Sequence, residues 1–492
     1  MLSASGSTED TSGDLLVDDR DLPSHARLIA DCARSADRVQ AQDRVHDLTE
    51  QMITETGRGL DLAQADLSGT NLSGFDLRYA ILNRASLHGS RLAGADLTGA
   101  SLVCAGMERT DFTDAILKGA YVHSMAAQAS NFTRADLGGL VDATGALFHG
   151  CNLTSARLAE AELAGTAFYQ CDLVGIGGHG ADLRGVVFNE CRMDHADLTR
   201  ARVDDVSILR SSIRGLILNH ARGRGVVVQR PTSADGLSLT DAHLPGLRLS
   251  EVRSRGLAGA HLHAPGIDVQ GCHLPGADLS HADLSRGRWD QSSLDDANVA
   301  GAVLADSSWF CVSARRADAT NVTGEGVTAS DCTFAEALFA GFAGRYATFR
   351  NCDFRSADLT GAYLYRASFI GDPPASACLA GARLDGANLT QAYLAADFTG
   401  ASIRQAWATY ARVNQSIFVN ADLRGTSLFH ASAVKTDFTG ARLGRQRGAI
   451  FADRCPGLPE ALGHGGDPDN KRVAELVEEL AALLARDSRK ST

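Results

Sequence analysis

A large apolar residue, most often leucine, returns at every fifth position over most of the chain. In the segment ADLSGTNLSGFDLRYAILNRASLHGSRLAGADLTGASL (65–102), the repeated position holds Leu67, Leu72, Leu77, Leu82, Leu87, Leu92, Leu97 and Leu102. An α-helix repeats at about 3.6 residues and a β-strand at about 2, so a period of five fits neither. The spacing predicts a repeat architecture, and this period decides which one.

Aromatic residues and cysteines reveal a second, longer period that spans four pentapeptides. Phe148, Phe168 and Phe188 occupy the repeated position, and the set Cys151, Cys171 and Cys191 occupies the position two residues before it, where alanine is usual. Four pentapeptides per period indicate a coil with four sides, on which residues one period apart stack. The sequence therefore predicts an all-β solenoid, with residues 60–445 forming about 19 coils in a rod of roughly 90 Å.

The motifs AGADLTGASL, PGADLSHADL, RSADLTGAYL and VNADLRGTSL resemble the A(D/N)Lxx repeats of pentapeptide-repeat proteins. The resemblance covers nearly four-fifths of the chain and implies a right-handed quadrilateral β-helix. Some members of that family resemble duplex DNA in shape and charge, bind DNA gyrase or topoisomerase IV, and protect them from quinolones or other toxins. Most members have no known role.

The chain is expected to have four parts. These are a disordered acidic tail (1–23), an N-terminal helical cap (24–58), the β-helix (59–445), and a C-terminal segment (446–492) with an amphipathic helix at about 468–487. Register breaks are expected near 138–146, 229–272, 370–378 and 394–398, and the stretch 231–272 fits two registers equally badly. One continuous stack with kinks is expected, with two separate rods as the alternative.

The expected C-terminal helix has one apolar face. Asp467 is its expected N-cap, and the face consists of Val473, Leu476, Val477, Leu480, Leu483 and Leu484. In the family such helices often mediate dimerisation, so a homodimer is one interpretation. The other is an intramolecular lid over the last coil.

The charge distribution limits how far the rod can imitate DNA. Duplex DNA carries about one negative charge per 1.7 Å, whereas residues 60–445 hold 39 acidic and 34 basic residues. Residues 210–256 are basic, with eight arginines against three acidic residues. This belt, which includes Arg222, Arg224 and Arg230, could dock an acidic partner or a phosphate, or it could be an ordinary solvated face.

A second partner-binding candidate is an outward loop formed by Gly371, Asp372, Pro373 and Pro374. Proline cannot donate a strand hydrogen bond, so this stretch is expected to leave the coil. Direct nucleic-acid binding is not expected from a chain with a net charge of −12.

Histidines gather in the middle of the chain. His243, His261 and His263 are weak candidates for a metal site, because His243 and His263 would share one face of adjacent coils if the downstream register extends back to them. No cysteine or carboxylate is clearly placed to complete the site, so surface histidines are the plainer interpretation. The cysteine ladder is interpreted as buried small residues. No metal or cofactor is expected.

The functional expectation is a non-enzymatic protein-interaction rod. The resemblance implies, as its most concrete form, a DNA mimic that protects DNA gyrase or topoisomerase IV, for antibiotic resistance or self-resistance. One alternative is a scaffold or regulator of another protein, and a second is an enzyme with a site in the irregular 220–285 region. No signal peptide or membrane span is visible, so a cytoplasmic location is expected.

Overall fold

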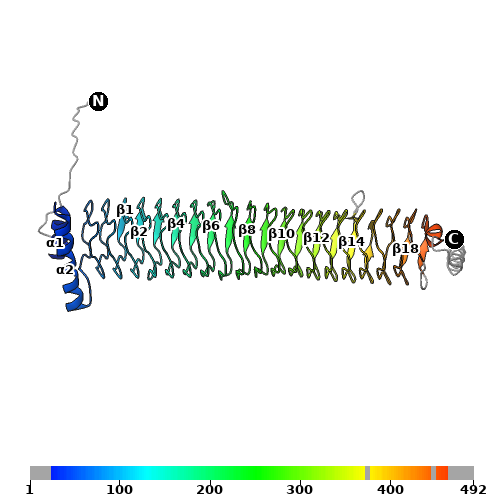
Figure 1. Ribbon diagram of the computed structural model, residues 1–492, viewed down its shortest axis with the longest axis horizontal. Coiled ribbons are helices and arrows are strands. Elements are labelled where there is room, and N and C mark those ends of the chain that lie inside the picture. Colours follow the sequence, from blue (N-terminus) through cyan, green and yellow to red (C-terminus); the bar gives the residue numbers. More distant parts are fainter. Residues whose placement is uncertain (1–23, 372–376, 445–449, 464–492) are drawn as a thin grey trace, which may run out of the picture.

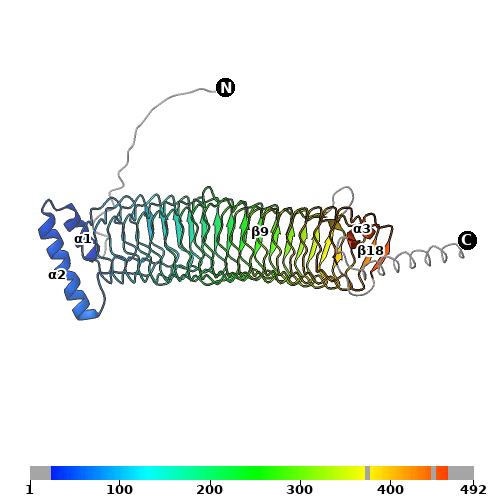
Figure 2. The same cartoon turned by 45° about the vertical axis from the view of Figure 1, so that its right-hand side comes forward.

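The computed structural model describes residues 24–371, 377–444 and 450–463, which form a long rod (Figure 1). Helices α1 (Ser24–Arg34) and α2 (Arg38–Thr56) lie against one end of the rod (Figure 2). The short helix α3 (Leu458–Gly463) lies near the other end. Within these ranges no helix has the length and hydropathy needed to cross a bilayer. Three predicted features lie outside the described residues. They are the tail 1–23, the loop residues Asp372, Pro373 and Pro374, and the C-terminal helix with Asp467, Val473, Leu476, Val477, Leu480, Leu483 and Leu484.

The rod is a parallel β-solenoid, as the sequence predicts. One 15-stranded sheet runs along it in chain order. Its strands are β1 (Gly106–Glu108), β2 (Ala126–Gln128), β3 (Leu147–His149), β4 (Ala167–Tyr169), β5 (Val187–Asn189), β6 (Ser207–Leu209), β7 (Val227–Gln229), β8 (Arg248–Ser250), β9 (Asp268–Gln270), β10 (Arg288–Asp290), β11 (Ser308–Phe310), β12 (Thr328–Ser330), β13 (Thr348–Arg350), β14 (Ser368–Ile370) and β16 (Tyr393–Leu394). The pairs β15 (Ala377–Cys378) with β17 (Ala396–Asp397), and β18 (Ser432–Val434) with β19 (Phe451–Asp453), are also parallel. Single parallel bridges on the other three sides join each coil to the next.

Local turn chemistry explains the period of five. The aspartate before each repeated leucine accepts a hydrogen bond from the backbone amide two residues later, as Asp96 Oδ1 does from Thr98 N at 2.9 Å. The next residue has a left-handed backbone, with φ of 66° at Gly99 and 61° at Arg200. Glycine adopts this conformation at least cost, and an aspartate side chain favours such turns. Each pentapeptide therefore contributes one flat side and one corner.

Aromatic rings one coil apart stack in the interior, which confirms the prediction made from their spacing. The ring centroids of Phe148 and Phe168 are 4.8 Å apart, and those of Phe168 and Phe188 are 5.2 Å apart. Trp289 and Trp309 stack in the same way at 5.0 Å. All five side chains are buried, so the core is one continuous apolar column.

The coil length changes at a few points. Most bridges join residues four pentapeptides apart, as Asp61 joins Ile81. Among the described residues, the coil gains one residue between Ala126 and Leu147 and between Ser212 and Ser233, and it gains a whole pentapeptide between Asp353 and Cys378. It loses one residue between Arg383 and Ser402 and again between Ser432 and Phe451. Each change occurs where the sequence loses its five-residue spacing. The described strands nevertheless belong to one stack, not to two rods.

The register break expected near 229–272 is present at Ser233, but the irregular stretch expected for 231–272 is not observed beyond that step. After the step at Ser233, the bridges return to the usual interval, as from Ala258 to Asp278. Here the two inward rows exchange sizes. The row that usually holds alanine contains Val252, Leu257 and Leu262, and the row that usually holds leucine contains Ser254, Gly259 and Ala264. Core volume is kept by this exchange, so the coil stays regular although the motif disappears.

A small apolar cavity of about 30 Å³ marks a place where the core is underfilled. Ala319 borders it and occupies an inward position that is Val299 in the preceding coil and Phe339 in the next. We expect Ala319→Val to raise the free energy of unfolding by about 0.5–1 kcal/mol, because it fills this space. The measurement is denaturant unfolding. Ala282→Val, in the crowded small-residue row, is the control and should destabilise; stabilisation by both variants would contradict the packing account.

Candidate interaction surfaces

Four basic side chains form one column on the outside of the middle coils. Arg202, Arg222, His243 and His263 are joined by successive parallel bridges, and we call this set the arginine–histidine column. Its two ends face carboxylates. Arg202 Nη1 lies 3.5 Å from Asp182 Oδ2, and His263 Nδ1 lies 3.1 Å from the Oδ2 atom of Asp283. The positive charge is therefore concentrated at the centre of the column.

The imidazoles of His243 and His263 stack with centroids 4.3 Å apart and planes within 6°. Partial burial lowers the pKa of His243, and the charges of His263 and Arg222 lower it further. A folded-state pKa below the ordinary value of about 6.5 means that the unfolded chain binds this proton more tightly. The contribution of His243 to the free energy of unfolding is therefore lost as the pH falls from the ordinary histidine pKa to the lower pKa of the folded state.

We expect His263→Gln to raise the pKa of His243, because the substitution removes a neighbouring positive charge. The measurement is an NMR titration of the His243 ring protons. Arg222→Gln should shift the pKa in the same direction, and His179→Gln, on a different side of the rod, serves as the control. An unchanged His243 titration in both the His263 and the Arg222 variants would contradict the assignment.

The histidine geometry does not resemble a metal site. The nitrogen lone pairs of stacked imidazoles lie in parallel planes, so those of His243 and His263 do not converge on one point. His261 lies at an adjacent corner and stacks on His281 at 5.2 Å. Three histidines are thus divided between two stacks.

In the described part of the chain, one group of three ligand-type residues converges: His46, Glu50 and Asp76. Arg78 already binds this group, with Nη2 at 2.6 Å from Asp76 Oδ2 and a second contact to Glu50. His46 Nδ1 lies 2.7 Å from the same Asp76 oxygen. The cluster therefore fastens α2 to the first coils.

The other two candidate arginines lie beside the column. Arg224 lies in the bend two positions after Arg222, and both residues are exposed. Arg230 lies at the next corner and is ion-paired, with its Nε 2.8 Å from Glu251 Oε1. Arg222 and Arg224 thus form one surface with the histidines, whereas Arg230 is locally neutralised.

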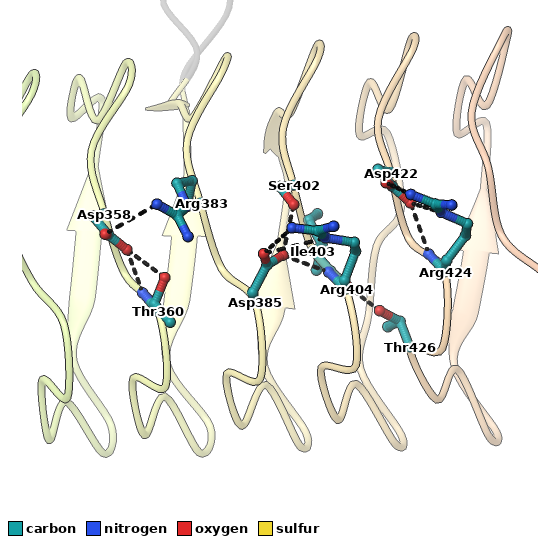
Figure 3. A network of polar contacts seen from close by, with 10 residues as sticks. All are labelled: Asp358, Thr360, Arg383, Asp385, Ser402, Ile403, Arg404, Asp422, Arg424 and Thr426. Carbon is teal, nitrogen blue, oxygen red and sulfur yellow. Dashed lines mark hydrogen bonds and ion pairs between the residues drawn. The ribbon is translucent and has the colours of Figure 1, made fainter.

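Acidic and basic residues alternate on another side of the rod (Figure 3). This aspartate–arginine face consists of Asp358, Thr360, Arg383, Asp385, Ser402, Arg404, Asp422 and Arg424. Arg404 Nη2 lies 3.0 Å from Asp385, and Arg424 Nη2 lies 2.7 Å from Asp422. Thr360 N donates to Asp358 Oδ1 at 2.9 Å, so this carboxylate also forms its own turn.

Hydrogen bonds hold these carboxylates in the ionised state. Partial burial acts to raise the pKa of Asp385, but donation from the Ser402 hydroxyl and from the Arg404 backbone and guanidinium outweighs it, so the pKa lies below its ordinary value. The Arg424 guanidinium likewise lowers the pKa of Asp422. Along the same side, Ile116, Gly177 and Ile217 interrupt the acidic residues. This side does not present the unbroken negative line of a DNA strand.

Sequence reasoning missed a cluster of exposed aromatic side chains near the C-terminal end of the rod. Tyr393, Trp407, Tyr410, Phe429 and Phe451 are between 37% and 64% exposed. They occupy outward positions, where any residue fits the motif, so each alone is unremarkable. Ring contacts join Tyr410 to Phe429 and, through His430, to Phe451, and only alignment of the coils reveals that these residues are neighbours.

Comparison with known proteins gives consistent results. The family model described as pentapeptide repeats matches residues 58–92, 80–119, 130–175, 179–207, 272–308, 330–371, 376–409 and 409–445, which together exceed half of the chain. Among solved structures, HetL from the cyanobacterium Nostoc sp. strain PCC 7120, a protein involved in heterocyst differentiation regulation, is 22% identical over 52% of this chain and 92% of its own, with a TM-score of 0.19. Full-length QnrB1, a plasmid-mediated fluoroquinolone resistance protein, is 16% identical over 44% of this chain and 95% of its own, with a TM-score of 0.16. No curated protein matches the chain. At these identities and TM-scores the two structures carry no argument about this chain.

Proposed function

The chain belongs to the pentapeptide-repeat family, and on this premise we propose that it is a non-enzymatic interaction protein that binds a protein partner through its outer faces. The observation that carries the proposal is the arrangement of charged side chains in fixed columns on a rigid core, as in the arginine–histidine column. Stacked coils satisfy one another's backbone groups, so the surface is ordered before binding. Preorganisation lowers the entropic cost of association.

The specific partner that we propose is a type II topoisomerase, DNA gyrase or topoisomerase IV, which the protein would protect from an antibiotic or toxin. Support comes from the family resemblance and from the rod shape. Acidic and basic side chains alternate on the aspartate–arginine face, so the rod does not present a continuous negative surface like that of DNA. This alternation favours binding of the topoisomerase through local surface patches.

The experiment is a supercoiling assay with DNA gyrase, with and without a quinolone. Protection predicts that added protein restores supercoiling in the presence of the drug. The loop at Gly371–Pro374 is the proposed contact, and deleting residues 372–376 would return the long step between Asp353 and Cys378 to the usual four pentapeptides, which preserves the stack. This deletion should abolish protection without unfolding the rod. No effect of the protein in either condition would exclude this partner.

The second candidate is a scaffold or regulator of another protein. The near balance of 39 acidic and 34 basic residues in 60–445 favours it, because a topoisomerase mimic would gain from a larger negative charge. The experiment is affinity capture from the native cell, with the unmodified chain and with the variant Arg222→Gln/Arg224→Gln. A partner that binds the surface formed by Arg222 and Arg224 should be captured by the unmodified chain and not by the variant. The enzyme alternative rested on an irregular middle, and that region is regular. A homodimer through Val473–Leu484 and a cytoplasmic location remain proposals.

A further inference from the structure

An open groove of about 710 Å³ is lined by residues of the last coils, among them Tyr393 of β16 and Ser432 of β18. Its main lining residues are Arg366, Gln391, Tyr393, Tyr410, Arg412 and His430, and we call it the aromatic groove. The coil that supplies Tyr410 also presents Trp407, which is 64% exposed. The ring centroid of Phe429 lies 4.1 Å from that of His430, so Phe429 extends the apolar surface.

The groove is positively charged, although the chain as a whole is acidic. Arg366 and Arg412 line it, and its remaining lining residues, Ala411 and Ser432, are neutral. Arg366 also lies over the ring of Tyr365, which Arg345 contacts from the preceding coil. Tyrosine, tryptophan and arginine are the residue types that dominate binding energy at protein interfaces. The complementary ligand carries carboxylates together with apolar side chains.

The orientation of the rings favours a peptide over a nucleic acid. Tyr410, His430 and Phe451 stack on one another, with centroid distances of 5.2 Å and 5.9 Å and interplanar angles of 16° and 19°. Single-stranded nucleic acids bind by stacking bases on open ring faces. In this stack the facing surfaces of Tyr410, His430 and Phe451 cover one another, so little ring face is left between them for a base.

Residues 9–22 of this chain, EDTSGDLLVDDRDL, have the complementary chemistry. They contain six acidic residues and one arginine around Leu15, Leu16 and Val17. A chain cannot place them in its own groove. His25 Nδ1 accepts a hydrogen bond from the Asp61 backbone amide, which anchors this end of the chain at the first coil. Residues 9–22 reach at most about 55 Å from Ser24, whereas Trp407 is roughly 17 coils, or about 80 Å, from Asp61.

We propose that residues 9–22 of one copy bind the aromatic groove of a second copy, which joins the rods head to tail. The two ends of the rod carry different halves of the contact, so the interface is heterologous. Such an interface does not close and leads to open-ended association. The proposal is independent of the external partner, and the supercoiling assay does not bear on it.

The test compares two variants of the full chain. The groove variant combines Tyr410→Ala with Arg412→Gln, and the tail variant replaces Asp14, Asp18, Asp19 and Asp21 by asparagine. Sedimentation analysis over a range of concentrations should show open-ended association of the unmodified chain, and each variant alone should associate at least about tenfold more weakly. Mixing the two variants should restore one contact and yield one-to-one complexes, because one has an intact tail and the other an intact groove.

Controls separate this mechanism from others. The control variant combines Tyr121→Ala with Arg157→Gln, at exposed residues far from the groove, and should associate as the unmodified chain does. Added salt should weaken the association of the unmodified chain. Circular dichroism should show both variants folded; Arg366→Gln is the substitute if the groove variant is not. A chain that stays monomeric, association that stops at a dimer and ignores both variants, or a mixture without complexes would overturn the proposal. So would a groove that binds a single-stranded oligonucleotide and not a synthetic peptide of residues 9–22.

Discussion

Replacing Phe168 by alanine is expected to lower the local free energy of unfolding by about 3–5 kcal/mol. The ring lies between Phe148 and Phe188, with centroid distances of 4.8 Å and 5.2 Å, and it is buried. Its removal leaves a cavity that two rings on adjacent coils border. Rigid stacked coils cannot collapse into that cavity without losing the hydrogen bonds of the ladder.

Native-state hydrogen exchange is the suitable measurement, because a long repeat array need not unfold in one step. Protection of amides in 148–188 should fall in Phe168→Ala. Phe168→Leu should cost less than about 1.5 kcal/mol, since leucine is the usual residue of this row. Phe310→Ala, at a side chain that is 47% exposed, is the matched control. Equal effects of the buried and exposed substitutions would contradict the stacked core.

Gly223→Val is expected to destabilise the rod by about 3 kcal/mol, for a different reason. A Cβ atom at Gly223 would lie 2.4 Å from the Val203 carbonyl carbon and 2.5 Å from the Asp204 nitrogen of the preceding coil. These are backbone atoms, and they cannot move aside because Val203 N donates to the Arg222 carbonyl at 2.8 Å. The coils would have to separate at the arginine–histidine column.

Gly177→Val provides the matched control, because nothing lies within 4 Å of a Cβ atom at that position. Its expected effect is within about 0.5 kcal/mol. Hydrogen exchange around 200–245 should report the loss in the Gly223 variant alone. Full protection in Gly223→Val would show that the coils are less tightly stacked there than the structure indicates.

The fold could be predicted because the sequence contains two independent periods. The period of five residues sets the length of one side of the coil. The interval of four pentapeptides between Phe148, Phe168 and Phe188 sets the number of residues in one complete coil. The middle could not be predicted from the motif, because Leu257 and Gly259 exchange the usual order of large and small inward residues. Total volume, not residue order, keeps that coil regular.

The surfaces were predicted less completely. The shared face of His243 and His263 followed from spacing, but their parallel stacking depends on side-chain orientation, which spacing does not encode. The aromatic groove was missed for a geometric reason. One coil before it is a pentapeptide longer than usual and another is one residue shorter, so alignment at the usual interval does not bring Tyr393 and Tyr410 together.

The central claim is that each coil of four pentapeptides advances the rod by one strand spacing. Pulsed electron paramagnetic resonance can test it with spin labels on Ala159, Ala260 and Ala340, which lie in one outward column. Labels attached through a noncanonical residue leave the eleven native cysteines untouched. We expect separations of roughly 24 Å for 159–260, roughly 19 Å for 260–340 and roughly 43 Å for 159–340, so that the two shorter distances add up to the longest. A 159–340 distance well below that sum would contradict it, because the coils would then not form one straight stack.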